Sequence, residues 1–162
     1  MRFNTDASFI GIAGLKQTHQ RQVADFQRWA AQDDWEQFHA SHYDWWAFPI
    51  DAPSSYGLKY TVYEGDVVEL KRDSAFGESF CRGVFLVAAS WGWDLDNQTH
   101  LADPQPGQSW HRWPVRLYKA ARSVKLFGYQ DLFESLRKYA RELFEQGESF
   151  SFAGYDLSKI FK

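Results

Sequence analysis

Cysteine, proline and long apolar runs are all scarce in this chain of 162 residues. The single cysteine, Cys81, excludes an intramolecular disulfide. No apolar run approaches the ~20 residues that a helix needs to cross a bilayer. The first residues also lack the charged start and apolar stretch of a signal peptide. We therefore expect a cytoplasmic protein that does not associate with a membrane.

The short motifs of common enzymes are absent as well. The chain has no P-loop, G-x-S-x-G elbow, G-x-G-x-x-G turn or H-E-x-x-H pair. His39 and His42 supply half of a zinc site at i, i+3, but no further ligand follows at a recognised spacing. Cys81 lies in an apolar segment, where a thiol stays protonated and unreactive. We expect no metal ion, no cofactor and no catalytic residue of a known class.

Aromatic residues, in contrast, are abundant. Eight Trp, eight Tyr and 14 Phe make 19% of the chain, while charged residues make 24%. A chain of this length buries roughly 70% of its unfolded surface, so a core built largely from rings is expected. No repeat is present, and we predict a single domain over residues 1–162.

Most apolar residues recur at the helical period. The segment from Asp73 or Ser74 to Gly92 has apolar residues on nearly all sides, which predicts the central buried helix. The same spacing predicts helices over residues 17–31 and, after Asp33 as a cap, around residues 35–38. Residues 1–16 are expected to form an irregular N-terminal arm.

The C-terminal third predicts a helix hairpin. Pro114 suits the first turn of one helix, and Gly128 suits its C-terminal cap. A second helix is expected to begin at Asp131 and to pack antiparallel to the first. Residues 148–162 are expected to form a C-terminal tail. Together these segments predict a mostly all-α domain.

Residues 59–71 allow two interpretations. Their alternation and the Glu64-Gly65-Asp66 turn fit a small β-hairpin. Alternatively, Thr61 and Glu64 form the capping box of a helix that runs through Arg72. We favour the helix.

Charge is distributed unevenly along the chain. Residues 1–109 hold 8 Lys and Arg against 15 Asp and Glu, whereas residues 110–162 hold 10 against 6. The segment from Trp110 to Lys125 has five Lys and Arg and no acidic residue. On a helix, four of these cations would lie close to one face, which suits an anionic partner such as a nucleic acid backbone or an acidic protein surface. They are Arg112, Arg116, Lys119 and Arg122. The alternative is that they pair with the acidic N-terminal part.

A second dense feature is the segment Tyr43–Pro49, which contains Trp45 and Trp46. Its rings either fill the core or line a pocket with Trp91. In the latter case, His42 and Asp44 would orient a small molecule or act as general acid and base. A third alternative is an adaptor whose exposed rings dock another protein.

These two features together resemble the conserved domain of the opioid growth factor receptor family, including its bacterial relatives. In that family a His or acidic residue and a Tyr lead into a Trp-x-Phe-Pro element, similar to residues 42–49. A later basic helix ends in a Leu-Gly step, similar to residues 115–128, although the His and Asn that commonly precede it are replaced here by His111-Arg112-Trp113-Pro114. The resemblance covers roughly residues 24–145 and implies an all-helical fold, but no catalytic residues. From the residues themselves we expect a binding domain that uses the basic helix.

Overall fold

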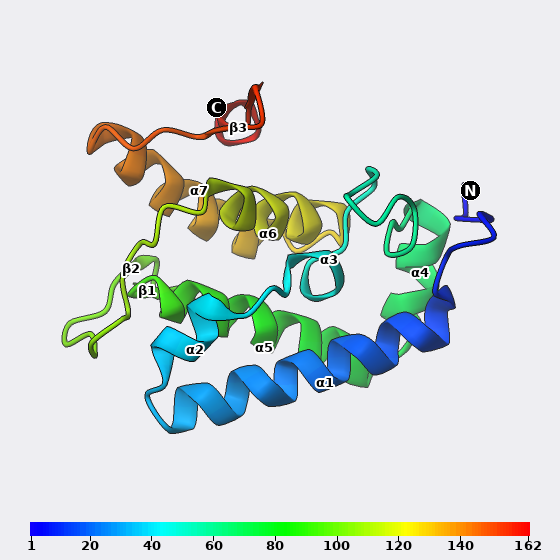
Figure 1. Cartoon of the computed structure of the whole chain (residues 1–162), viewed down its shortest axis with the longest axis horizontal. Coiled ribbons are helices and arrows are strands. Elements are labelled where there is room, and N and C mark those ends of the chain that lie inside the picture. The colour runs from blue at the N-terminus through cyan, green and yellow to red at the C-terminus, as the bar shows by residue number, and fades with distance from the viewer.

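A computed structural model describes all 162 residues (Figure 1). Helices dominate it, and the strands form two short antiparallel pairs, β1 with β2 and β3 with β4. No helix has the length and apolarity that spanning a membrane would require. In chain order the elements are α1 Gly11–Ala31, α2 Trp35–Ala40, α3 Asp44–Ala47, α4 Glu64–Arg72, α5 Ser74–Ser90, β1 Trp93–Asp94, β2 Thr99–His100, α6 Pro114–Leu126, α7 Gln130–Glu145, β3 Ser151–Phe152, β4 Tyr155–Asp156 and the 3₁₀ helix η1 Ser158–Phe161.

The N-terminal arm is shorter than the sequence predicts, because α1 already begins at Gly11. Its first turns are held by apolar contacts: Leu15 is fully buried, and Ile10 and Ile12 pack against the core. The residues before them are tied to a distant segment. The Asn4 side chain donates to the carbonyls of Leu58 and Thr61, both at 2.8 Å.

Residues 64–72 form helix α4, so the helical interpretation of this segment is the correct one. The cap differs from the expected Thr61 and Glu64. Instead, the carboxylate of Asp66 accepts a hydrogen bond from the backbone N–H of Tyr63 at 2.9 Å, which satisfies a donor that the helix leaves free. Asp66 also accepts from the backbone N–H of Asn4 and thereby joins the arm to α4.

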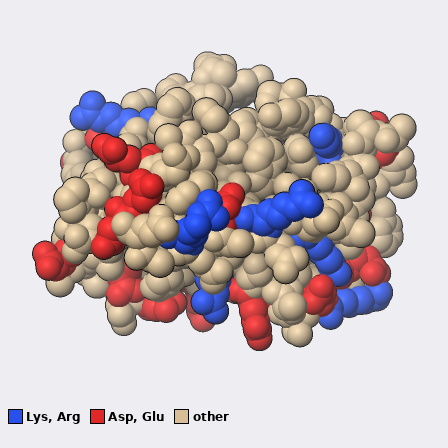
Figure 2. Space-filling view, turned by 60° about the horizontal axis from the view of Figure 1, so that its bottom comes forward, with Lys and Arg blue, Asp and Glu red and all other residues tan.

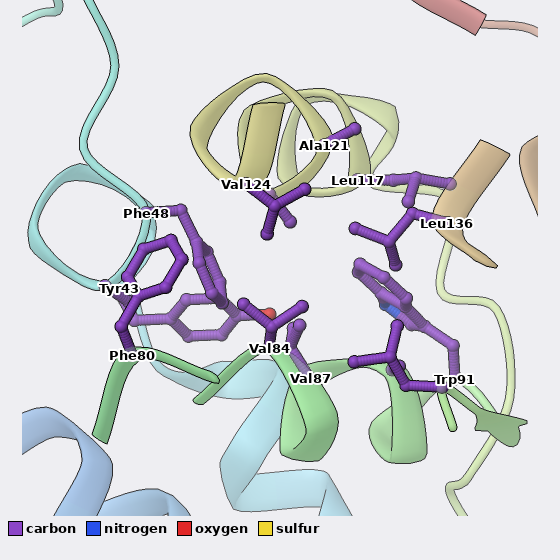
Figure 3. Close-up of a cluster of buried hydrophobic side chains, with 14 of the residues drawn as sticks. Tyr43, Phe48, Phe80, Val84, Val87, Trp91, Leu117, Ala121, Val124 and Leu136 are labelled. Atoms are coloured by element: carbon purple, nitrogen blue, oxygen red, sulfur yellow. The ribbon is translucent and has the colours of Figure 1, made fainter. Parts of the chain in front are cut away.

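Helix α5 is the central core element that the sequence predicts. Its start is capped by Asp73, whose carboxylate accepts from the backbone N–H groups of Ala75 and Phe76. Figure 3 shows Val84 and Val87 of α5 directed at Val124 and Leu117 of α6. The expectation that the helix is buried on nearly all sides is wrong, because Glu78, Arg82 and Phe85 are exposed, as are Ser74 and Ala75 at its start.

Helices α6 and α7 lie side by side as the expected hairpin (Figure 1). Pro114 occupies the first turn of α6, and Gly128 ends it with a φ of +82°, a conformation that glycine adopts without strain. The C-terminal tail packs back onto this hairpin. Phe150 and Phe161 are buried, and η1 contacts both α6 and α7.

Candidate functional site

The basic helix α6 does not expose its cations as one face. Arg116 is only 4% exposed. Its guanidinium donates to the carbonyls of His39 at 2.9 Å and Ser41 at 2.7 Å, and its Nε lies 3.5 Å from the carboxylate of Asp44. The carbonyls at the end of α2 have no partner within their own helix, so Arg116 satisfies them. This cation holds the fold together and is not free for a partner.

Lys119 points to the same carboxylate. Its Nζ lies 3.8 Å from Asp44 and 5.0 Å from the ring centre of Trp45, and its side chain is 12% exposed. Burial lowers the pKa of Lys119, an effect that the charge of Asp44 opposes. Because Arg116 and Lys119 share one buried carboxylate, they stabilise the contact between α3 and α6.

Of the other two selected cations, Arg122 lies on α6, whereas Arg112 precedes the helix, which begins only at Pro114, and does not share its face as expected. Arg122 donates from Nε to Asp51 at 2.8 Å and from Nη1 to the Tyr118 hydroxyl at 2.6 Å. Arg112 is 82% exposed, and its Nε lies 3.7 Å from Glu148. Pairing with the acidic N-terminal part, the alternative open at the sequence level, thus describes Arg116, Lys119 and Arg122.

The structure does not bring the predicted aromatic pocket together. His42 is exposed, and the cavity beside Trp45 measures about 10 Å³, room for at most one water molecule. The indole N–H of Trp46 donates to Gln22 at 2.8 Å. Trp91 packs instead against Trp110 and Tyr139. In Figure 3 it lies on the opposite side of the core from Tyr43 and Phe48, which neighbour Trp45 and Trp46 in sequence.

A larger hollow opens between α6 and the C-terminal tail. Its volume is about 530 Å³, within the range of small-molecule sites. The side chains that line it come from the loop after α3, from α6 and from the segment Asp156–Ile160. They are Asp51, Tyr118, Arg122, Lys125, Leu126, Asp156, Leu157, Lys159 and Ile160. We call this site the tail hollow.

Three cations and two carboxylates line the tail hollow. Arg122 is held by Asp51, as described above. Hydrogen bonds from Ser158 lower the pKa of Asp156, and the charges of Lys162 and Lys159 contribute to this shift. Neither Lys125 nor Lys159 forms an ion pair. The hollow therefore presents two ammonium groups without a carboxylate in contact.

Sequence reasoning did not select these two lysines. Lys125 belongs to the basic segment but lies one turn beyond the four cations that the helical face grouped together. Lys159 belongs to a tail too short for a clear helical period. The sequence does contain one indication of where Lys159 lies. The spacing of Leu157, Ile160 and Phe161 predicts a short helix with one apolar side toward the core, which leaves Lys159 on the other side.

The groove between α1 and α5 is a second concave feature, with a volume of about 590 Å³. Charges of both signs line it, and Lys16 pairs with Asp73 across it at 3.3 Å. Figure 2, in which the lower side of Figure 1 comes forward, shows acidic side chains gathered at the left and basic and acidic side chains interspersed elsewhere. Lys16 and Asp73 neutralise each other, and Glu78 and Arg82 add one charge of each sign, so this groove has no excess charge.

Two histidines, His39 and His19, have buried imidazole rings. Nε2 of His39 lies 2.8 Å from the carbonyl oxygen of Ser90 and 2.9 Å from that of Gly107, while Nδ1 is buried without a partner. The ring of His111 stacks on His39 with 3.5 Å between the ring centres. Burial lowers the pKa of His39 to about 4, with further lowering by His111 and Arg116, and burial lowers the pKa of His19 to about 4. Both rings are neutral at pH 7.

Comparison with known proteins found no match: no family model fits the chain, and neither a curated protein nor a solved structure is detectably similar to it. Membership of the opioid growth factor receptor family stays a prediction from the two sequence motifs.

Proposed function

We propose that this protein is a non-enzymatic binding domain that holds the anionic group of a partner in the tail hollow. The basic helix α6 still provides the binding face, but through its second half. The observation that carries the proposal is that Lys125 and Lys159 line one hollow and neither has a carboxylate in contact. A bound anion would supply the charge that this hollow lacks.

The burial of the other cations favours this site over the middle of α6. Arg116 would have to give up the carbonyls of His39 and Ser41 to bind a ligand. Leaving those buried carbonyls without donors costs about 1–3 kcal/mol each. Lys125 and Lys159 need to break no ion pair to bind an anion. Nζ of Lys125 lies 5.1 Å from the ring centre of Phe133, and Asp156 is the carboxylate of the hollow with which an anion would compete.

The shape of the site favours a single anionic group over a nucleic acid backbone. A nucleic acid binds along an extended row of cations, and its affinity grows with each phosphate contact. With Arg116 and Lys119 turned onto Asp44, α6 has no such row. A concave hollow with two free ammonium groups suits one compact anion. We propose this binding for a cytoplasmic protein, in keeping with the sequence.

The test uses inorganic phosphate and the melting temperature of the protein at constant ionic strength. A ligand that binds only the native state stabilises it by RT ln(1 + L/Kd), where L is the free ligand concentration, so the melting temperature rises with ligand concentration. We expect phosphate to raise the melting temperature of the wild type and not that of the double variant Lys125→Ala/Lys159→Ala. The control is Arg112→Ala, which removes an exposed cation outside the hollow and should leave the phosphate effect intact. An equal response of all three proteins would refute the site.

A further inference from the structure

The tail hollow has an apolar wall in addition to its cations. Leu126, Leu157 and Ile160 line it and are only partly buried, although each also packs against the core. The ring of Tyr118 belongs to the same wall and is likewise half-buried. The apolar surface that remains here is concave and lies directly beside the ammonium groups.

The arrangement follows from the two elements that build it. On α6, Tyr118, Arg122, Lys125 and Leu126 recur at steps of four, three and one, so that they follow one stripe along the helix. Helix η1 lies against this stripe and adds Leu157, Ile160 and Lys159 from the other side. Each element thus contributes both a cation and apolar side chains.

We infer that the ligand of the tail hollow is a small phosphate monoester with an apolar, preferably aromatic, body. This inference rests on the proposed function, because it assigns a ligand class to the same site. A phosphate monoester carries close to two negative charges at neutral pH. With Arg122 paired to Asp51, the hollow holds Lys125 and Lys159 against Asp156, an excess of one positive charge that attracts such a dianion. Its apolar body would cover the wall of Leu126, Leu157 and Ile160.

A carboxylate fits the site less well. A carboxylate matches the planar fork of a guanidinium, but the only guanidinium in the hollow, that of Arg122, already holds Asp51 at 2.7 Å. Lysine ammonium groups act as point charges and bind the oxygens of a phosphate without a fixed orientation. The lysines therefore favour a phosphate group over a carboxylate, and the apolar wall favours an apolar group attached to that phosphate.

The experiment compares three probes on the wild-type protein: phenyl phosphate, inorganic phosphate and phenol. Each is titrated at constant ionic strength near pH 7.5, with binding followed by calorimetry and by melting temperature. Burial of one ring against the wall should make phenyl phosphate bind about tenfold more tightly than inorganic phosphate, which corresponds to about 1.4 kcal/mol. Phenol, which lacks the charge, should bind much more weakly than phenyl phosphate.

The outcomes separate the two proposals. Equal binding of phenyl phosphate and inorganic phosphate, lost in Lys125→Ala/Lys159→Ala, would leave the proposed function intact and overturn the ligand class. Failure of both phosphates to bind would overturn both proposals. Binding of phenyl phosphate that the double variant retains would also overturn both, because the ligand would then lie elsewhere.

A variant of the wall gives a second, independent measurement. Ile160→Thr removes the terminal methyl group of this side chain, replaces the Cγ1 methylene with a hydroxyl and leaves both lysines in place. We expect it to reduce the preference for phenyl phosphate several-fold while the affinity for inorganic phosphate stays within twofold. An unchanged preference in a variant that keeps the wild-type melting temperature would contradict the inference.

Discussion

Lowering the pH from 7 to 4 is expected to weaken the native fold through the buried imidazole of His39. Nε2 of this ring lies between two carbonyl oxygens, so the neutral ring carries its proton there and donates to them. A second proton must go to Nδ1, which is buried without an acceptor and close to the charges of His111 and Arg116. The native protein therefore resists protonation at this position.

The loss of stability follows from the difference between the pKa of His39 in the unfolded chain and its pKa in the native protein. The pKa of His39 falls from 6.5 to about 4 on folding. Below pH 6.5 the unfolded chain takes up a proton that the native state refuses, so stability is complete above this pH and declines as the pH falls toward 4. A shift of about 2.5 units corresponds to roughly 3 kcal/mol, all of it lost by pH 4. His19 acts in the same direction.

The variant His39→Gln isolates this contribution. Its amide places an N–H group near the position of Nε2 and does not titrate. At pH 7 the variant should be less stable than the wild type by about 1 kcal/mol, because the new hydrogen bonds are less well placed. As the pH falls to 4, this difference should vanish and then reverse. The measurement is urea unfolding at a series of pH values, followed by tryptophan fluorescence. A difference that stays constant from pH 7 to 4 would refute the assignment of the acid effect to His39.

Three further predictions concern stability and are all measured by urea unfolding at pH 7. Arg116→Leu should lower the free energy of unfolding by about 3 kcal/mol, because it removes a buried partner of Asp44 and the donors to the end of α2. Arg112→Ala should change it by less than about 0.5 kcal/mol. Similar losses in both variants would contradict the structural role of Arg116. Ser135→Ala should cost about 2 kcal/mol, because its buried hydroxyl accepts from the Trp93 indole at 3.1 Å and donates to the Leu95 carbonyl at 2.7 Å; a neutral effect would show that this network adds nothing. Gly92→Ala should lower the free energy of unfolding more than Gly147→Ala does. Both glycines have a positive φ, but only at Gly92 would the new Cβ meet a backbone oxygen, that of Gln108, at 2.9 Å. Equal losses of stability would mean that the backbone angle alone matters.

Some ends of the helices could be predicted because local chemistry determines them, whereas the cap of α2 is Asp34 and not the expected Asp33. Asp73, Pro114 and Gly128 each act within one helical turn of their own position, and each is found where the sequence places it. The start of α1 was missed because no capping side chain marks it; Ile10 makes no side-chain hydrogen bond to the helix. What holds this helix start is burial of Leu15, a tertiary effect.

The site could be predicted only in part. The basic segment drew attention to α6, but a helical wheel places Arg116 beside Arg112, which in fact precedes the helix, and does not show which side of the helix faces the protein. That choice depends on the carbonyls at the end of α2 and on Asp44, which are distant in sequence. The same limit applies to Lys159, whose neighbourhood with Lys125 exists only because the tail folds back onto α6.

The pairing of Asp44 with Arg116 also has a consequence for the order of events during synthesis. The bond from Arg116 to Ser41, beside this ion pair, joins residues 75 positions apart. When α3 leaves the ribosome, neither cation that will neutralise Asp44 has yet been made. An unpaired carboxylate costs several kcal/mol to bury, so α3 remains hydrated until α6 arrives. Docking of α3 must therefore wait for the basic helix, and the domain completes its core only once the chain has been extended past α6.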